Sequence, residues 1–143
     1  MEDPEIVFDP LPPDALRQFI INRLAAFGIA RTGVDAWQPI GFFLKSGQGE
    51  WQGGLLGGAW GGWMSIQFLW VAEAVRGQRQ GSRLMDAAES YAISRGCFAA
   101  NLDTHSYEAL GFYQKRGYEV FGSLEDFPPG HTKYFLRKRL IQS

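Results

Sequence analysis

Residues 71–85, VAEAVRGQRQGSRLM, place glycines and polar side chains between an apolar run and the start of a helical pattern. The first four amides of a helix have no partner within it and carry partial positive charge, so they bind phosphate oxygens readily. Gly77 and Gly81 would let a ligand approach the backbone closely. Arginines in the same stretch add donors suited to phosphate: Arg76, Arg79 and Arg83. The stretch predicts an anion site, and the alternative interpretation is an ordinary glycine turn with a solvated basic face.

A second motif follows downstream, LDTHSYEALGFYQKRGYEVFG at residues 102–122, with FYxxxGY at its core. Together the two motifs resemble the GNAT superfamily of acetyltransferases, whose signature is Arg or Gln, two free positions, Gly, one free position, and Gly or Ala. Arg76 takes its first position and Gly81 its last, whereas Arg79 departs from the pattern by standing where the first glycine is usual. The resemblance covers residues 37–140. It implies an α/β fold with a mixed sheet of six to seven strands and three to four helices, splayed between the fourth and fifth strands.

The resemblance also implies where acetyl-coenzyme A, the co-substrate of this superfamily, would bind. The main chain of the strand before the loop would hydrogen-bond the pantetheine arm, through Leu69, Trp70 and Val71. The loop amides would cradle the pyrophosphate, from Arg76, Gly77, Gln78, Arg79, Gln80, Gly81 and Ser82. Arg79 either crowds that group or contacts it. Ser106 stands where many members have an asparagine that contacts the cofactor, so this contact is lost, bridged by water, or replaced by capping of the next helix.

Tyr113 matches the tyrosine that many GNAT enzymes place beside the thioester sulfur. The resemblance implies a general acid that protonates the leaving thiolate or stabilises it by a hydrogen bond, and the alternative is a tyrosine packed in the core. The acceptor amine must be neutral to attack, so a base is needed. Asp103 is the preferred candidate, ahead of Glu73 and of a water relay, and each carboxylate has an alternative role as a capping or surface residue. His105 is interpreted as a loop residue, although imidazole suits proton transfer.

The hydrophobic pattern along the chain fits this alternation of strands and helices. Strands are predicted over 5–8, 37–45, 50–59, 63–71, 97–103, 118–124 and 131–140, and helices over 14–27, from 80 to a stop at Gly96, and over 106–116. The glycine- and tryptophan-rich run at 51–70 is interpreted as strands joined by glycine turns. The strand over 63–71 is expected to be covered on both faces.

Composition limits the remaining options. A chain of 143 residues with 45% hydrophobic content predicts one domain over 1–143. Its net charge of −1 gives no global attraction to nucleic acid or to a membrane surface. The acidic, proline-bearing start and a single cysteine predict a cytoplasmic protein. Cys97, His105 and His131 are too scattered for a zinc site, so no metal is expected. The resemblance leaves a homodimer open.

The sequence therefore predicts an N-acetyltransferase that moves the acetyl group of acetyl-CoA onto a primary amine of a small molecule by direct attack in a ternary complex. Two alternatives stay open: the same chemistry on a protein or peptide amine, and a non-catalytic acyl-CoA-binding sensor. A nucleotide hydrolase is set aside because the loop lacks GxxxxGK[ST].

Overall fold

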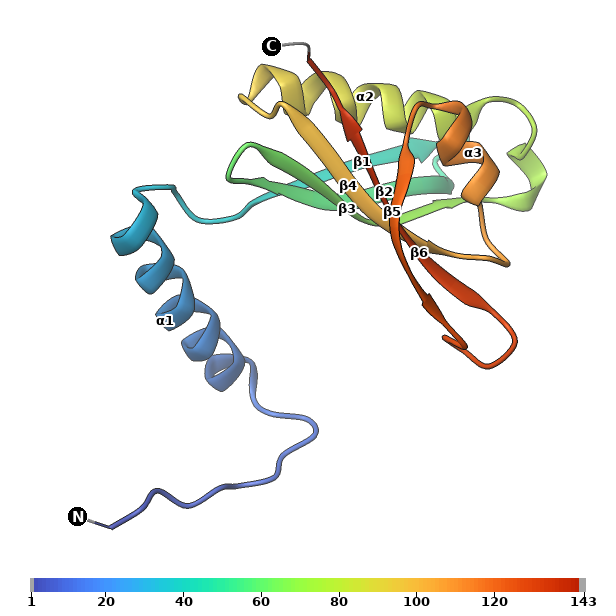
Figure 1. The fold of residues 1–143 in the computed structure, drawn as a ribbon. Coiled ribbons are helices and arrows are strands. Elements are labelled where there is room, and N and C mark those ends of the chain that lie inside the picture. Colours follow the sequence, from blue (N-terminus) through green and yellow to red (C-terminus); the bar gives the residue numbers. More distant parts are fainter. Residues whose placement is uncertain (1, 142–143) are drawn as a thin grey trace. The chain divides into compact units, whose positions relative to one another are not determined.

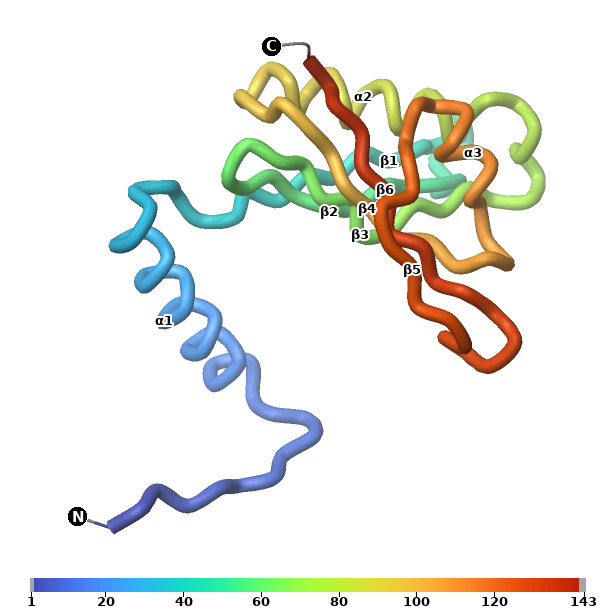
Figure 2. Tube along the Cα trace, viewed as in Figure 1, coloured from blue at the N-terminus to red at the C-terminus, as the bar shows by residue number. Residues whose placement is uncertain are grey.

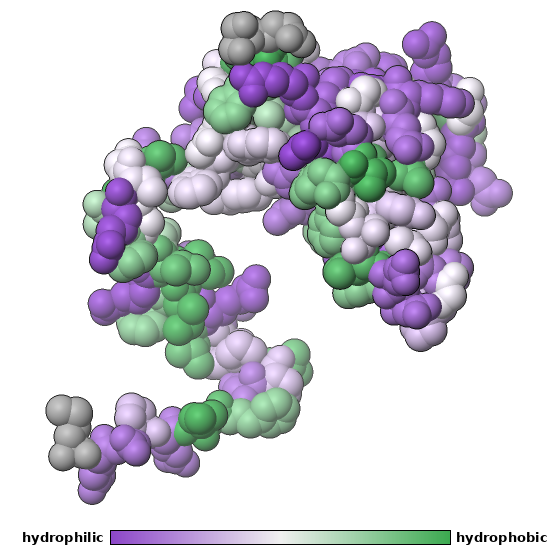
Figure 3. All heavy atoms as spheres, viewed as in Figure 1, coloured by the Kyte–Doolittle hydropathy of each residue, from purple (hydrophilic) through white to green (hydrophobic). Residues whose placement is uncertain are grey.

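The computed structural model describes residues 2–141, which divide into one unit up to Ala36 and a second from Trp37 onward. In the first unit, α1 (Asp14–Thr32) follows Pro13 and ends at Gly33, whose left-handed φ of 72° lets its N–H donate to the Ile29 carbonyl. The predicted end of this helix at residue 27 is wrong, because the helix continues through Gly28. All residues of α1 are half-buried or exposed, and Figure 3 shows hydrophobic residues gathered along it.

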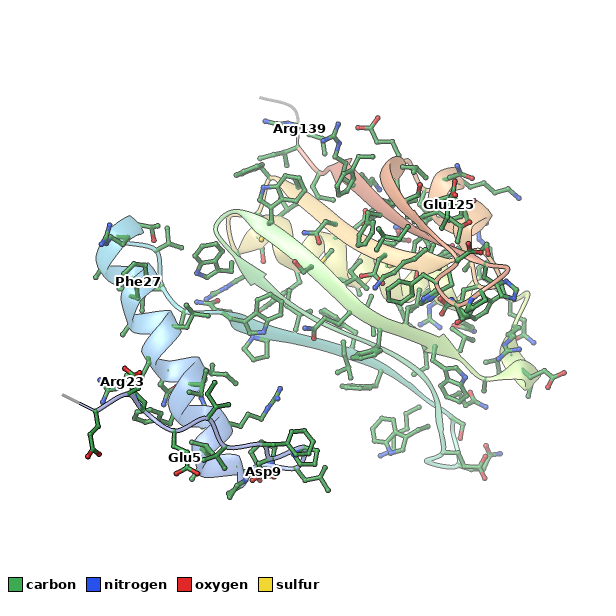
Figure 4. All side chains as sticks on the ribbon, turned by 60° about the horizontal axis from the view of Figure 1, so that its bottom comes forward. Glu5, Asp9, Arg23, Phe27, Glu125 and Arg139 are labelled. Atoms are coloured by element: carbon green, nitrogen blue, oxygen red, sulfur yellow. The ribbon has the colours of Figure 1, made fainter. Side chains whose placement is uncertain are left out.

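The strand predicted over residues 5–8 is also wrong, since this segment is irregular. A strand of four residues is stable only when its backbone groups pair with a neighbouring strand, and the sheet is built entirely from the second unit. Within α1, the Arg23 guanidinium lies 4.9 Å from the centre of the Phe19 ring, and Phe27 follows Arg23 one turn later (Figure 4).

The second unit contains a six-stranded mixed sheet with the strand order β1-β2-β3-β4-β6-β5 (Figure 1). Its strands are β1 (Gln38–Lys45), β2 (Trp51–Trp60), β3 (Trp63–Val71), β4 (Ala99–His105), β5 (Glu119–Glu125) and β6 (Thr132–Arg139). The sheet pairs are antiparallel except β3–β4, which is parallel. The predicted mixed α/β fold is confirmed, with six strands and three α-helices among the described residues.

The glycine-rich run forms the β2–β3 hairpin, with Gly61 and Gly62 at its turn. The other glycines of the run lie inside β2, where close neighbours exclude a side chain. A Cβ at Gly58 would fall within the Trp37 indole, and one at Gly57 would overlap the Ser65 carbonyl. These positions need glycine because other groups lie against the backbone, which the prediction of glycine turns did not include.

The strands β3 and β4 separate halfway along their length. Their register joins Trp63–Ile66 to Ala99–Leu102, and the strands then diverge toward Val71 and His105. This confirms the predicted splay. Burial on both faces of β3 is wrong: Met64 is fully buried on one face, whereas Phe68 is 68% exposed.

Two helices of the second unit bear on the site, α2 (Gln80–Ser94) and α3 (Leu110–Lys115). In Figure 1, α2 runs along one face of the sheet, against β1, β2 and β3. Its buried residues are Leu84, Met85, Ala88 and Ala92. Each buried Leu or Met contributes about 1.5–3 kcal/mol, which fixes the position of the helix start.

The helix predicted over 106–116 begins later than expected, at Leu110, because residues 106–109 form a turn instead. Within residues 2–141, no helix is both long and apolar enough to cross a bilayer. In the same part of the chain, no group of three or more His, Cys, Asp or Glu side chains is placed to hold a metal ion.

Candidate active site

A cavity of about 700 Å³ lies where β3 and β4 separate. One wall combines the end of β3 with the loop and first turn of α2, and the other is formed by the end of β4, the turn after it and the start of α3. Figure 2 shows the yellow-green loop between β3 and α2 that contributes to the first wall. The lining residues are Leu69, Trp70, Val71, Val75, Arg76, Gly77, Arg79, Gln80, Gly81, Ser82, Thr104, Tyr107, Glu108, Ala109, Phe112 and Tyr113.

The loop turns back on itself through two left-handed residues, Gly77 at φ 76° and Arg79 at φ 63°. Arg79 is the N-cap of α2, and the backbone donation from Arg83 N–H to its carbonyl, at 3.1 Å, closes the first helical turn. The amides of Gln80, Gly81 and Ser82 therefore point out of the helix end toward the cavity that these residues line. A Cβ at Gly77 would meet nothing within 4 Å, so the backbone there is open to a ligand.

Arg76 ties this loop to the strand before it. Its Nε donates to the Val71 carbonyl at 2.9 Å, and the Ala72 amide donates to the Gln52 carbonyl at 2.8 Å. These bonds fix the end of β3 where the pantetheine arm is predicted to run. The Val71 carbonyl keeps a second lone pair, so the Arg76 bond and a ligand bond are compatible.

Tyr113 lies on the opposite wall and is 7% exposed. Burial, reinforced by the negative charges of Glu108 and Asp103, raises the pKa of Tyr113 to about 12. The phenol therefore keeps its proton at neutral pH and acts as a hydrogen-bond donor. A phenol with a pKa of about 12 transfers its proton to a thiolate, whose acid has a pKa of about 8.5, only at a cost of roughly 5 kcal/mol.

The carboxylates predicted as bases lie outside the cavity lining. The side chain of Asp103 is 49% exposed and its Oδ1 is 3.7 Å from Lys133 Nζ. Glu73 begins a short 3₁₀ helix (Glu73–Val75) and is exposed. The negative charge of Asp103 thus contributes to the raised pKa of Tyr113, while the carboxylate itself is paired with Lys133.

Ser106 and Gln78 are also absent from the lining residues among residues 2–141. The Ser106 hydroxyl accepts from the Thr132 amide at 3.0 Å, and the Ser106 amide donates to the Thr132 carbonyl at 2.7 Å. Capping of the next helix by Ser106 is wrong, because α3 starts after Ala109 and Ser106 instead holds β4 to β6.

The structure adds a pair that the sequence interpretation did not connect. His105 Nδ1 lies 2.7 Å from Glu108 Oε1, and the His105 amide donates to the same oxygen at 2.8 Å. Burial raises the pKa of Glu108. The hydrogen bonds from the His105 amide and imidazole, together with the imidazole charge, lower this pKa by more than burial raises it, so the net shift is downward. The available sequence signal was a histidine and a glutamate three positions apart in a turn.

A polar cluster on Glu89 connects the two walls. This carboxylate, on α2, accepts from Lys138 at 2.8 Å, from the Tyr118 hydroxyl at 3.0 Å and from Arg116 at 3.3 Å. Arg116 follows α3 and also binds Asp86 at 2.8 Å. Because the groups are partly buried, the cluster holds α3 and β6 against α2 more firmly than exposed pairs would.

The sequence and the fold resemble acetyltransferases. The profile of the acetyltransferase (GNAT) family matches residues 7–118. The blasticidin-S acetyltransferase of Streptomyces morookaense is 40% identical over 65% of this chain and 69% of its own length. The acetyltransferase Atu2258 of Agrobacterium fabrum is 34% identical over 84% of this chain and 88% of its own. A crystal structure of an acetyltransferase from Bacillus cereus has a TM-score of 0.80 at 29% identity, covering 94% of this chain and 97% of that one.

Proposed function

We propose that this chain moves the acetyl group of acetyl-CoA onto a primary amine of a small molecule. The chain belongs to the acetyltransferase (GNAT) family and is an acyltransferase, which supports this proposal. The observation that carries this proposal is the cavity between the β3–β4 splay and α2, which has outward-pointing amides on one wall and Tyr113 on the other. The proposed reaction is direct attack by the amine while both substrates are bound, in the cytoplasm.

The residues of the loop wall fit the pyrophosphate of coenzyme A. The amides of Gln80, Gly81 and Ser82 converge at a helix start, where the helix dipole favours negative charge. Arg76 and Arg79 add cationic donors at the same wall. Acetyl-CoA supplies an acyl group activated as a thioester.

Tyr113 would act on the departing sulfur. Its pKa of about 12 makes it a poor proton donor but leaves the hydroxyl protonated, so a hydrogen bond to the thiolate is the contribution best supported. The buried position holds this donor in place without a reorganisation cost at the moment of reaction.

The choice of a small molecule as acceptor is supported by the relative named for blasticidin-S, at 40% identity. The test is release of coenzyme A thiol from acetyl-CoA with a panel of amines that includes blasticidin-S, simple alkylamines and peptides with free N-termini. Turnover with small amines and not with peptides is expected. Acetylated peptides alone would move the acceptor to proteins, and acetyl-CoA binding without turnover on any amine would favour a sensor.

A further inference from the structure

The turn that follows β4 holds an imidazole against a carboxylate at the edge of the cavity. The Glu108 amide donates to the His105 carbonyl at 2.9 Å, while Glu108 Oε1 accepts from the His105 amide and lies 2.7 Å from its Nδ1. Thr104, Tyr107 and Glu108 line the cavity, and His105 lies between them in the chain without being a lining residue itself. Its side chain is 21% exposed, which leaves part of the ring open to solvent.

The hydrogen-bond partners determine which ring nitrogen carries the proton. Glu108 has a lowered pKa and is therefore an acceptor at neutral pH. A carboxylate accepts from Nδ1 only if Nδ1 carries hydrogen, and in the neutral ring this leaves Nε2 with a free lone pair. The turn thus fixes the tautomer that can take up a proton at Nε2.

The groups around the ring hold its orientation. The His105 ring stacks on Tyr107 with centroids 5.2 Å apart, and Phe127 lies tilted at 5.9 Å. Lys133 is the direct partner of His105 across the β4–β6 ladder, and it pairs with Asp103 at 3.7 Å. On the far side of Tyr107, the His131 ring packs edge-on at 5.0 Å.

These neighbours also give the two candidate bases, His105 and Asp103, different charged partners. Asp103 and Lys133 partly neutralise one another, and Lys133 lies over the rings of Phe127 and Phe135 as well. The ionised Glu108 gives the imidazole a favourable partner if it becomes charged. The His105 imidazole therefore has an anionic partner, whereas the Asp103 carboxylate already has a cationic one.

We propose that His105 is the base that takes the proton from the acceptor ammonium, with Glu108 as the positioning residue that holds Nδ1. This role of His105 rests on the proposed acetyl transfer to an amine. It assigns to His105 the role of base that the sequence predicted for Asp103.

The proton balance is simple. One N–H bond of the ammonium breaks, its electron pair stays on nitrogen, and the proton goes to Nε2 of His105 and then to solvent. Of the other two protons, one remains on the product amide nitrogen and one ends on the coenzyme A thiol. No oxidant or further reactant is needed.

The first test compares His105→Asn with His131→Asn. Asparagine at 105 places an amide near the former Nδ1, so it can still donate to Glu108 and keep the turn, but it has no second ring nitrogen. General-base catalysis contributes about 100-fold or more, and a loss of that size in kcat/KM for the amine is expected, with partial rescue by added imidazole. Wild-type kcat/KM should level off at the pH where an imidazole base is neutral, whereas in His105→Asn it should keep rising toward the pKa of the amine, because only free amine then reacts.

His131→Asn changes the other histidine of the same aromatic group and should retain the wild-type rate and pH profile. Wild-type kcat/KM in His105→Asn would overturn the role of His105 while leaving acetyl transfer intact. Absence of turnover by the wild-type chain on every amine would instead contradict the proposed function and the inference together.

A second readout needs no turnover. Nitrogen-15 NMR of the free protein distinguishes the two neutral tautomers of imidazole. Hydrogen on Nδ1 and a bare Nε2 are expected for His105, and Glu108→Gln should redistribute the two tautomers. Hydrogen on Nε2 in the wild-type protein would overturn the proposal, because that nitrogen could then not accept a proton.

Discussion

The two walls of the cavity differ in the groups that they present: backbone amides on one wall and side chains on the other. The loop wall uses the backbone: left-handed Gly77 and Arg79 turn the chain so that the first amides of α2 face outward. The opposite wall uses side chains: Tyr113 is buried, and Glu108 lines the cavity and holds His105 at its edge. The first wall has fixed dipoles that suit an anion, and the second has groups that can donate or accept a proton.

This difference shows which substitutions each wall tolerates. A wall built from the backbone accepts Arg79 where the superfamily usually has glycine. The amides keep their direction as long as residue 79 adopts the left-handed φ of 63°. A side-chain-built wall loses its chemistry when a single oxygen or nitrogen is removed. Substitutions on each wall test this contrast.

Tyr113→Phe removes one oxygen from the side-chain wall. Loss of a donor to the departing sulfur should lower kcat at least about 100-fold, while the dissociation constant of acetyl-CoA changes little. Thiol release gives the rate and calorimetry gives the affinity. Tyr91→Phe, on α2 and outside the lining residues, is the matched control and should behave like the wild type. Full activity of Tyr113→Phe would remove this tyrosine from the mechanism.

Gly81→Leu blocks the backbone wall. A Cβ at Gly81 would already lie 3.3 Å from Phe112 Cζ, so a larger side chain must displace that ring or enter the cavity. Acetyl-CoA affinity should fall at least tenfold, or about 1.4 kcal/mol, with an unchanged circular dichroism spectrum. Gly111→Leu, at an exposed position of α3 where a Cβ meets nothing within 4 Å, should retain affinity. Equal affinity in both variants would place the pyrophosphate elsewhere.

Alkaline pH should weaken the side-chain wall specifically. Because the pKa of Tyr113 is raised to about 12 in the folded state, its stabilising contribution is complete below about pH 10 and is lost as pH rises through about 12. The corresponding loss is roughly 2–3 kcal/mol in the free energy of unfolding. Burial beside Glu89 also raises the pKa of Tyr118, which adds a loss of the same sign at higher pH.

Urea unfolding of wild type and Tyr113→Phe from about pH 9 to about pH 12 measures this effect. The variant should lose less stability over that range because it has no phenol to ionise at position 113. Parallel curves for the two proteins would contradict the raised pKa.

Arg79→Gly should have the smallest effect. A left-handed conformation costs a non-glycine residue about 1–2 kcal/mol, and glycine removes this cost. Glycine also makes the unfolded chain more flexible, which lowers the stability of the folded state by about 0.5–1 kcal/mol. The net gain in unfolding free energy should therefore lie between about 0 and about 1.5 kcal/mol. Arg79→Ala keeps the strain and removes the charge, so it should bind acetyl-CoA less tightly at low salt without gaining stability. A destabilised Arg79→Gly would show that φ is not strained.

Much of the loop wall could be predicted from the sequence. The bounds of β3 and the start of α2 at Gln80 agree with the structure, because apolar runs, helical spacing and glycines act within a few residues of one another. The end of α1 could not be assigned in this way, since Gly28 and Gly33 both follow helical residues and only Gly33 adopts the left-handed conformation.

The sequence by itself predicted six of the strands, the loop between β3 and α2 and the position of Tyr113 on the next helix. Only the tertiary structure decided the partners of the reactive side chains. Asp103 meets Lys133, and Ser106 meets Thr132, because β6 lies beside β4 in an antiparallel register. Such contacts join residues far apart in the chain, and they depend on strand order and register, which no local pattern of residues encodes.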